Sequence, residues 1–150
     1  MPELCAVNRQ SMIYIERRAV FSAAHRLVNP NWSDEKNAEV FGHCANKYSH
    51  GHNFQLIVTV KGDVNPDTGF VMNLADLKDV IHEHVIQHVD HRNLNDDVPF
   101  MQGIMPSTEN LAIAMWEQLE SPIASHGAAL HRIRIIETEN NFVEYYGEGK

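Results

Sequence analysis

Apolar residues between positions 73 and 89 recur at helical spacing, which predicts a helix. Asn73 precedes this segment and can accept hydrogen bonds from the first free N–H groups of the helix. A second helix is predicted from Ser107, directly after Pro106. A shorter helix is expected between Ser33 and Gly42, because acidic residues follow Ser33 and glycine commonly ends a helix.

Alternating apolar and polar positions predict four β-strands, at residues 12–24, 52–60, 130–138 and 142–146. The order of elements is strand, strand, helix, helix, strand, strand. That order predicts an α+β fold in which an antiparallel sheet carries two helices on one face. Because such a sheet would expose its second face and two edges, we expect copies of it to associate into a closed ring.

The length of 150 residues predicts a single domain, at residues 12–150, after a flexible leader at residues 1–11. A chain of this size buries about 68–70% of its unfolded surface, so it needs neither a disulfide nor a metal to fold. The chain is acidic, with 12 Lys and Arg residues and 20 Asp and Glu residues. It also has no run rich in Lys and Arg, and this argues against nucleic acid as a partner. The two cysteines stand in unlike contexts and no signal peptide is recognisable, so we expect a cytoplasmic protein. The absence of a long apolar run predicts that the chain has no membrane segment.

His50 and His52 stand two residues apart, so on an extended strand both side chains project from the same face. His25, at the end of the first predicted strand, is a candidate third ligand. Three neutral imidazoles with an open position describe a catalytic zinc site, whereas a structural site is closed by four protein ligands. The alternative is that His50 and His52 line a polar strand face, and the motif alone gives both interpretations about equal weight.

Cys44 could be a fourth ligand or a base close to the metal. Five residues separate it from His50, which does not match the short cysteine hooks of structural zinc modules. A thiol held beside zinc and imidazoles would be partly thiolate near neutral pH, and this suits proton abstraction. The alternative is a buried, unreactive cysteine.

Three further motifs each have a structural alternative. His84 and His88 lie four apart on the predicted helix and could share a metal, but solvated residues near a helix C-terminus are the favoured interpretation. Asp90 can orient and activate the neighbouring His91, as in acid–base relays, or the pair can simply cap a helix end. Glu137, at a strand end, needs donors if it is buried, and a guanidine-like ligand edge or an arginine would supply them.

These motifs, taken in order, resemble the 6-pyruvoyl-tetrahydropterin synthase family. The matching segments are Phe21–Leu27, Phe41–Cys44, His50–Asn53, Gly69–Leu77, Asp90–Leu94, Ser107–Asn110 and Glu137–Asn141. The resemblance covers about residues 12–147, and the ordered set is far more specific than any one motif. It implies the tunnelling fold, a β-β-α-α-β-β unit whose trimers form a barrel and pair into a homohexamer with active sites at subunit interfaces.

The resemblance also implies a reaction and a role for each candidate residue. The reaction is the zinc-dependent conversion of 7,8-dihydroneopterin triphosphate to 6-pyruvoyl-tetrahydropterin with loss of triphosphate, a lyase step of tetrahydrobiopterin biosynthesis. The implied roles are zinc binding by His25, His50 and His52, proton transfer by Cys44, Asp90 and His91, anchoring of the pterin by Glu137, and further pterin contacts by Ser107, Thr108 and Glu109.

Two other functions stay open at this point. The 6-carboxy-tetrahydropterin synthases of queuosine biosynthesis are similar in fold, metal and substrate, but have a shorter gap between their cysteine and the HxH pair. The loop 45–49 and His43 differ from the animal enzymes, which leaves the substrate preference open. A non-catalytic zinc-binding oligomer is the other possibility, and the joint presence of Cys44, Asp90, His91 and Glu137 argues against it.

Overall fold

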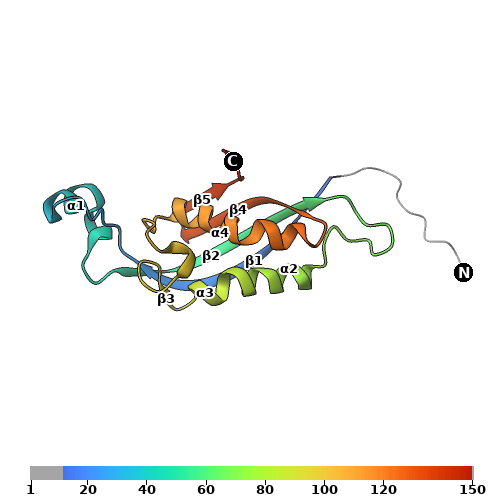
Figure 1. Cartoon of the computed structure of the whole chain (residues 1–150), viewed down its shortest axis with the longest axis horizontal. Coiled ribbons are helices and arrows are strands. Elements are labelled where there is room, and N and C mark those ends of the chain that lie inside the picture. Colours follow the sequence, from blue (N-terminus) through green and yellow to red (C-terminus); the bar gives the residue numbers. More distant parts are fainter. Residues whose placement is uncertain (1–11, 150) are drawn as a thin grey trace, which may run out of the picture.

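The computed structural model describes residues 12–149, so the expected leader at residues 1–11 lies outside the described residues. One five-stranded sheet, in the order β3-β1-β2-β4-β5, is covered on one face by helices (Figure 1). Its strands are β1 (Ile13–His25), β2 (His50–Gly62), β3 (Arg92–Asn93), β4 (Ala129–Thr138) and β5 (Asn141–Tyr145). The helices are α1 (Asp34–Phe41), α2 (Leu74–Ile81), α3 (Gln87–Val89) and α4 (Thr108–Ala124), with two short 3-10 segments at Gly42–Ala45 and Pro99–Met101.

The predicted α+β class is confirmed, and the four predicted strands lie within two residues of their expected bounds. The structure differs from the prediction in β3, a fifth strand that runs parallel to β1. A strand of two residues is too short to carry an alternating pattern, so periodicity cannot predict it.

The core lies between the sheet and the helices, and it sets the register of the central strands. Phe21 of β1 is paired with Phe54 of β2, and their rings stack with centroids 4.9 Å apart. Leu77 of α2 and Met115 of α4 are fully buried against this sheet. Burying a side chain of this size contributes about 1.5–3 kcal/mol, so a slip of one residue in the strands would be strongly disfavoured.

The helix predicted after Asn73 is interrupted by a π turn. Helix α2 is followed without a break by a π-helical segment, His82–Ile86, and then by α3. Buried positions Ile81, Val85 and Val89 are spaced four apart, which is more than one α-helical turn of about 3.6 residues. The wider π turn keeps these side chains facing the core and sets where the helix ends before Asp90.

Within the described part of the chain, both edges of the sheet are largely unpaired. β1 meets β3 only at Ala23 and Ala24, and β5 forms the opposite edge. The helix-free face carries exposed apolar side chains, including Val20 at 66% and Phe142 at 52% exposure. Among residues 12–149 no helix has the length and apolar content needed to span a bilayer.

Candidate active site

Strand pairing brings three histidines together at one end of the sheet. His25 ends β1 and is directly paired with His50, the first residue of β2, while His52 is paired with Ala23. The three rings lie 4.6–5.3 Å apart between centroids. Each ring offers a nitrogen within 4.8 Å of the other two, so one metal ion can reach all three.

The chemistry of these nitrogens fits a metal ion. His25 Nδ1 lies 2.8 Å from the carbonyl oxygen of Pro106, and because a carbonyl only accepts, Nδ1 carries the proton and Nε2 keeps a lone pair. Within the described part of the chain, His25 Nε2, His50 Nδ1 and His52 Nε2 are buried without a hydrogen-bond partner. Buried polar atoms are rarely left unpaired, and three adjacent ones are what a metal site requires.

The surroundings favour the neutral imidazole, the form that binds metals. Burial is the largest effect on all three histidines and lowers the pKa of each below the ordinary value of 6.5. The hydrogen bond to Pro106 and the carboxylate of Glu137 oppose this effect at His25. The balance leaves lone pairs available at neutral pH.

Glu137, near the end of β4, borders both the histidines and a cavity. Its Oε1 lies 3.4 Å from Nε2 of His25 and 3.4 Å from Nε2 of His52, and its side chain is 22% exposed. On its other side is a cavity of about 480 Å³. The residues that line the cavity are Thr108, Glu109, Glu137, Asn140, Asn141, Phe142 and Val143.

The structure therefore brings three of the four predicted pterin contacts, Thr108, Glu109 and Glu137, to one cavity. Ser107 is different, because it does not line that cavity. Its Oγ accepts a hydrogen bond of 3.2 Å from the N–H of Asn110, so it is the N-cap of α4. Ser107 thereby positions the first turn of the helix on which Thr108 and Glu109 lie.

Asp90 and His91 follow α3 and are anchored to β1. Asp90 Oδ1 accepts a 2.9 Å hydrogen bond from the N–H of Ser22 and lies 3.1 Å from His91 Nδ1. The Ser22 N–H is the main reason that the pKa of Asp90 is lowered, with His91 adding to it and burial opposing it. His91 has a φ of 58°, in the left-handed region, and its side chain is 82% exposed. The pair thus presents an oriented imidazole outward from the chain.

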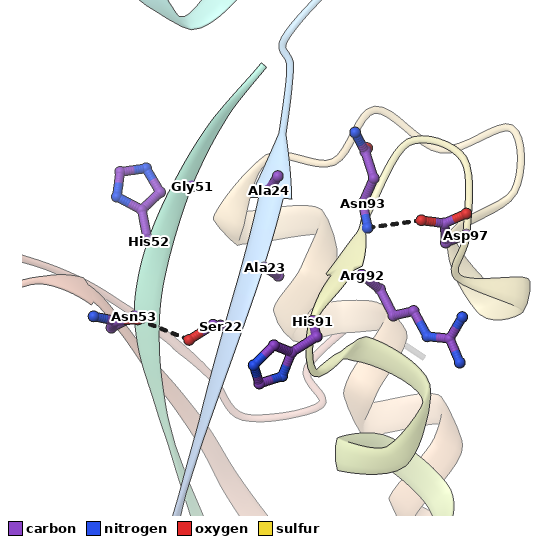
Figure 2. Close-up of a pocket in the computed structure, with 10 residues that line it drawn as sticks. All are labelled: Ser22, Ala23, Ala24, Gly51, His52, Asn53, His91, Arg92, Asn93 and Asp97. Carbon is purple, nitrogen blue, oxygen red and sulfur yellow. Dashed lines mark hydrogen bonds between the residues drawn. The ribbon is translucent and has the colours of Figure 1, made fainter. Parts of the chain in front are cut away.

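His91 lines an open cavity of about 520 Å³, together with residues of β1, β2 and β3. Figure 2 shows His52 on β2, and His91 on the far side of β1 from β2. A 2.7 Å hydrogen bond from Ser22 Oγ to Asn53 Oδ1 joins the two strands between them. His52 and His91 both line this cavity, and no hydrogen bond or ion pair joins them among the described residues.

Cys44 lies in the 3-10 segment Gly42–Ala45 and is a half-buried free thiol. Its carbonyl oxygen accepts a 2.7 Å hydrogen bond from the N–H of Leu27, which ties this segment to the chain just after β1. Cys44 is not part of the three-histidine group. Among the described residues no hydrogen bond or ion pair joins it to Asp90 or His91, so one chain does not assemble these three residues into a connected triad.

Two residues that the sequence analysis did not single out hold these parts together. Asn95 Oδ1 accepts from the N–H of Arg26 at 2.8 Å, and Asn95 Nδ2 donates to the Arg26 carbonyl at 2.9 Å. Arg26 Nε in turn donates to the carbonyl of Ala45 at 3.0 Å. The residue after His25 is thus bound both to the loop beyond His91 and to the segment that carries Cys44. Arg26 lies inside a recognisable motif, but no sequence pattern pairs it with Asn95.

Comparison with known proteins agrees with this geometry. Residues 14–148 match the family model described as 6-pyruvoyl tetrahydropterin synthase. The human protein named 6-pyruvoyl tetrahydrobiopterin synthase is 43% identical over 141 residues, covering 94% of this chain and 96% of the relative. The solved structure of Caenorhabditis elegans 6-pyruvoyl tetrahydropterin synthase superimposes with a TM-score of 0.86 at 41% identity, covering 93% of this chain and 98% of that chain. A protein of Archaeoglobus fulgidus named putative 6-carboxy-5,6,7,8-tetrahydropterin synthase is 31% identical over 124 residues, or 83% of this chain and 87% of the relative.

Proposed function

The chain belongs to the 6-pyruvoyl tetrahydropterin synthase family, and we propose that it converts 7,8-dihydroneopterin triphosphate to 6-pyruvoyl-tetrahydropterin with release of triphosphate. The observation that carries this proposal is a cluster of three histidines with free nitrogens beside a carboxylate that borders a cavity. Similarity over nearly the whole length of the human relative supports the same activity. We place the reaction in the cytoplasm, where the free thiol of Cys44 would stay reduced.

His25, His50 and His52 would hold a zinc ion. Their lowered pKa values and unpaired nitrogens suit a divalent metal with imidazole ligands, and three protein ligands with an open position are typical of catalytic zinc. Bound zinc would supply a Lewis acid that makes the C–H groups beside the side-chain hydroxyls of the substrate more acidic.

Glu137 would anchor the pterin in the cavity that it shares with Thr108 and Glu109. A carboxylate can accept from the pterin's amino group and ring N–H together, a paired and charge-assisted contact. The cavity volume of about 480 Å³ lies in the range of small-molecule sites. Ser107 would contribute by capping the helix that carries Thr108 and Glu109.

Cys44, Asp90 and His91 would move the protons. The Cys44 thiolate would take a proton from a side-chain carbon, so that the electron pair of that C–H bond shifts into the N5=C6 bond of the pterin and reduces the ring. Triphosphate would leave in a separate elimination, and tautomerisation of the resulting enols would give the diketone side chain. The redox change is then internal to the substrate, and no nicotinamide or flavin is required. Asp90 would hold the His91 ring in one tautomer, with a free nitrogen that accepts and returns a proton.

We propose that the complete site combines residues of neighbouring chains in a homohexamer, a dimer of trimers. Within one chain His91 is 82% exposed, and among the described residues it shares no hydrogen bond or ion pair with Cys44, which supports a partner chain supplying one side of the relay. The unpaired edges of β1 and β5 and the exposed apolar side chains of the helix-free face support the closure of sheets into a ring.

A turnover assay tests the proposal directly. The purified protein loaded with zinc is incubated with 7,8-dihydroneopterin triphosphate, and the pterin product is identified by mass spectrometry while released triphosphate is measured. We expect 6-pyruvoyl-tetrahydropterin. A 6-carboxy product would instead assign the activity named for the Archaeoglobus relative, and no turnover by the zinc-loaded protein would leave a non-catalytic scaffold.

A further inference from the structure

A backbone carbonyl, rather than a side chain, orients the candidate metal ligand His25. His25 Nδ1 donates to the carbonyl oxygen of Pro106 at 2.8 Å, and the contact is buried. Within residues 12–149 this is the one hydrogen bond of the His25 ring. The direction of the ring, and of the Nε2 lone pair left for a metal ion, therefore depends on where the Pro106 carbonyl points.

Proline and a tight turn set the direction of that carbonyl. The ring of a proline keeps its φ near about −65°. The N–H of Ser107 donates to the carbonyl of Met105 at 2.9 Å, and this bond closes a γ-turn around Pro106. The ring fixes φ of Pro106 and the turn fixes ψ, so the Pro106 carbonyl keeps its direction only while the turn stays closed.

Asn110, in the first turn of α4, is bonded to both ends of this γ-turn. Its side-chain Nδ2 donates to the Met105 carbonyl at 3.0 Å. Its backbone N–H donates to Ser107 Oγ at 3.2 Å. A carbonyl oxygen has two lone pairs, and the Met105 oxygen uses one for Ser107 and the other for Asn110.

The chemistry of this position calls for a donor. Asn110 is the third residue of α4, where Glu or Gln commonly reaches back to accept a hydrogen bond from the N–H of the N-cap residue. Here the N–H of the N-cap, Ser107, is already bonded to the Met105 carbonyl. An acceptor at position 110 would find that donor occupied, whereas the Asn110 amide can donate to the carbonyl itself.

We propose that Asn110 is a positioning residue of the metal site, which acts on His25 through the turn Met105–Ser107. This inference rests on the metal-binding part of the proposed function and on none of its proton transfers. The outer partner of a metal-binding histidine fixes the orientation and the tautomer of the ring. Without the Asn110 amide the turn loses one of its two closing contacts, so the Pro106 carbonyl holds the His25 ring less firmly.

Zinc affinity, measured by chelator competition, tests the proposal without any pterin. The proteins are the wild type, Asn110→Ala and the control Asn73→Ala, which removes an asparagine that caps α2 through the N–H of Ala75. We expect Asn110→Ala to bind zinc about 3–10-fold more weakly. The effect is below the 10–100-fold or so that is typical of a direct outer partner, because Asn110 acts through one further contact. The control should bind zinc like the wild type, and an unchanged affinity in Asn110→Ala would overturn the proposal.

The visible spectrum of the Co²⁺-loaded protein separates positioning from a general loss of stability. It should change in Asn110→Ala, because the His25 ring alters its direction at the metal, and it should stay unchanged in Asn73→Ala. Zinc should also raise the Tm of Asn110→Ala less than that of the other two proteins, since weaker binding stabilises the folded state less. A lower Tm with an unchanged spectrum and an unchanged zinc effect would give Asn110 a structural role only and overturn the proposal.

Asn110→Asp serves as the second variant if Asn110→Ala does not fold. It keeps the shape of the side chain and removes the donor. Its added negative charge would by itself strengthen the binding of a cation, so weaker zinc binding would have to come from the lost hydrogen bond. Equal or stronger binding would overturn the proposal. A wild type that binds no zinc would refute the proposed metal site itself, and the role of Asn110 with it.

Discussion

Asn95 clamps the chain directly after the first metal-site histidine, and its replacement by alanine should loosen the site. Its side chain accepts from the N–H of Arg26 and donates to the carbonyl of the same residue, at 2.8 and 2.9 Å. Both contacts are partly buried, so Asn95→Ala leaves two backbone groups without their partner. His25 precedes Arg26, and its ring position depends on where the strand ends.

The size of the effect follows from the two lost hydrogen bonds. Each contributes about 0.5–1.5 kcal/mol net, so we expect Asn95→Ala to lose about 1–3 kcal/mol of unfolding free energy. For a chain of this size each kcal/mol lowers Tm by about 2–4 °C, which gives a decrease of about 2–12 °C. Zinc affinity should fall as well, because the His25 backbone is no longer held against the loop 92–97.

Thermal unfolding and zinc chelation are measured on the wild type, Asn95→Ala and the control Asn31→Ala. Asn31 is exposed in the turn before α1, so its side chain should be replaceable without effect. Protein concentration is kept equal, because the Tm of an oligomer depends on it. If Asn95→Ala has the same Tm and the same zinc affinity as the wild type, the two hydrogen bonds of Asn95 do not position His25 and the reasoning is wrong.

Four further predictions test the assigned roles. His50→Ala should remove most of the bound zinc and Cys44→Ala should leave most of it; equal losses by metal analysis would make Cys44 a ligand. Cys44→Ala and His91→Asn should lower turnover by about 10²–10⁴-fold while pterin binding persists, and near-normal turnover in Cys44→Ala would take the thiol out of the mechanism. Glu137→Ala should weaken pterin binding by about 1–3 kcal/mol in calorimetry, and an unchanged affinity would place the pterin elsewhere. Folding lowers the pKa of Asp90 below its ordinary value of 3.8, so the ionised carboxylate stabilises the folded state fully above pH 3.8 and loses this effect as pH falls through the folded pKa. The difference in unfolding free energy between the wild type and Asp90→Asn should therefore shrink in acid. A difference that stays constant with pH would contradict this.

The sequence determined the secondary structure and the parts of the site that are local in the chain. Periodicity located the helices after Asn73 and Ser107, because burial of one face leaves its spacing in the residues themselves. The HxH pair was recognisable for the same reason, since alternation on a strand places His50 and His52 on one face whatever the strand pairs with. The family resemblance was likewise visible, because it is carried by ordered motifs.

Short or irregular elements left no such signal. The two residues of β3 and the π turn at His82–Ile86 are set by packing against β1 and the core. A pattern of period 3.6 predicts one continuous α-helix there. The reason for the wider π turn is seen only in the folded chain, where Val85 and Val89 are both buried.

The tertiary structure alone decided which distant residues share the site. Register pairs His25 with His50, a contact across 85 positions places Glu137 of β4 beside His52 of β2, and the Pro106 carbonyl selects the tautomer of His25. Among the described residues of one chain, it also joins Cys44 to His91 by no hydrogen bond or ion pair. These relations depend on strand pairing and on backbone carbonyl groups. Because every residue carries the same carbonyl group, the residue types in the sequence do not predict which carbonyl will be used.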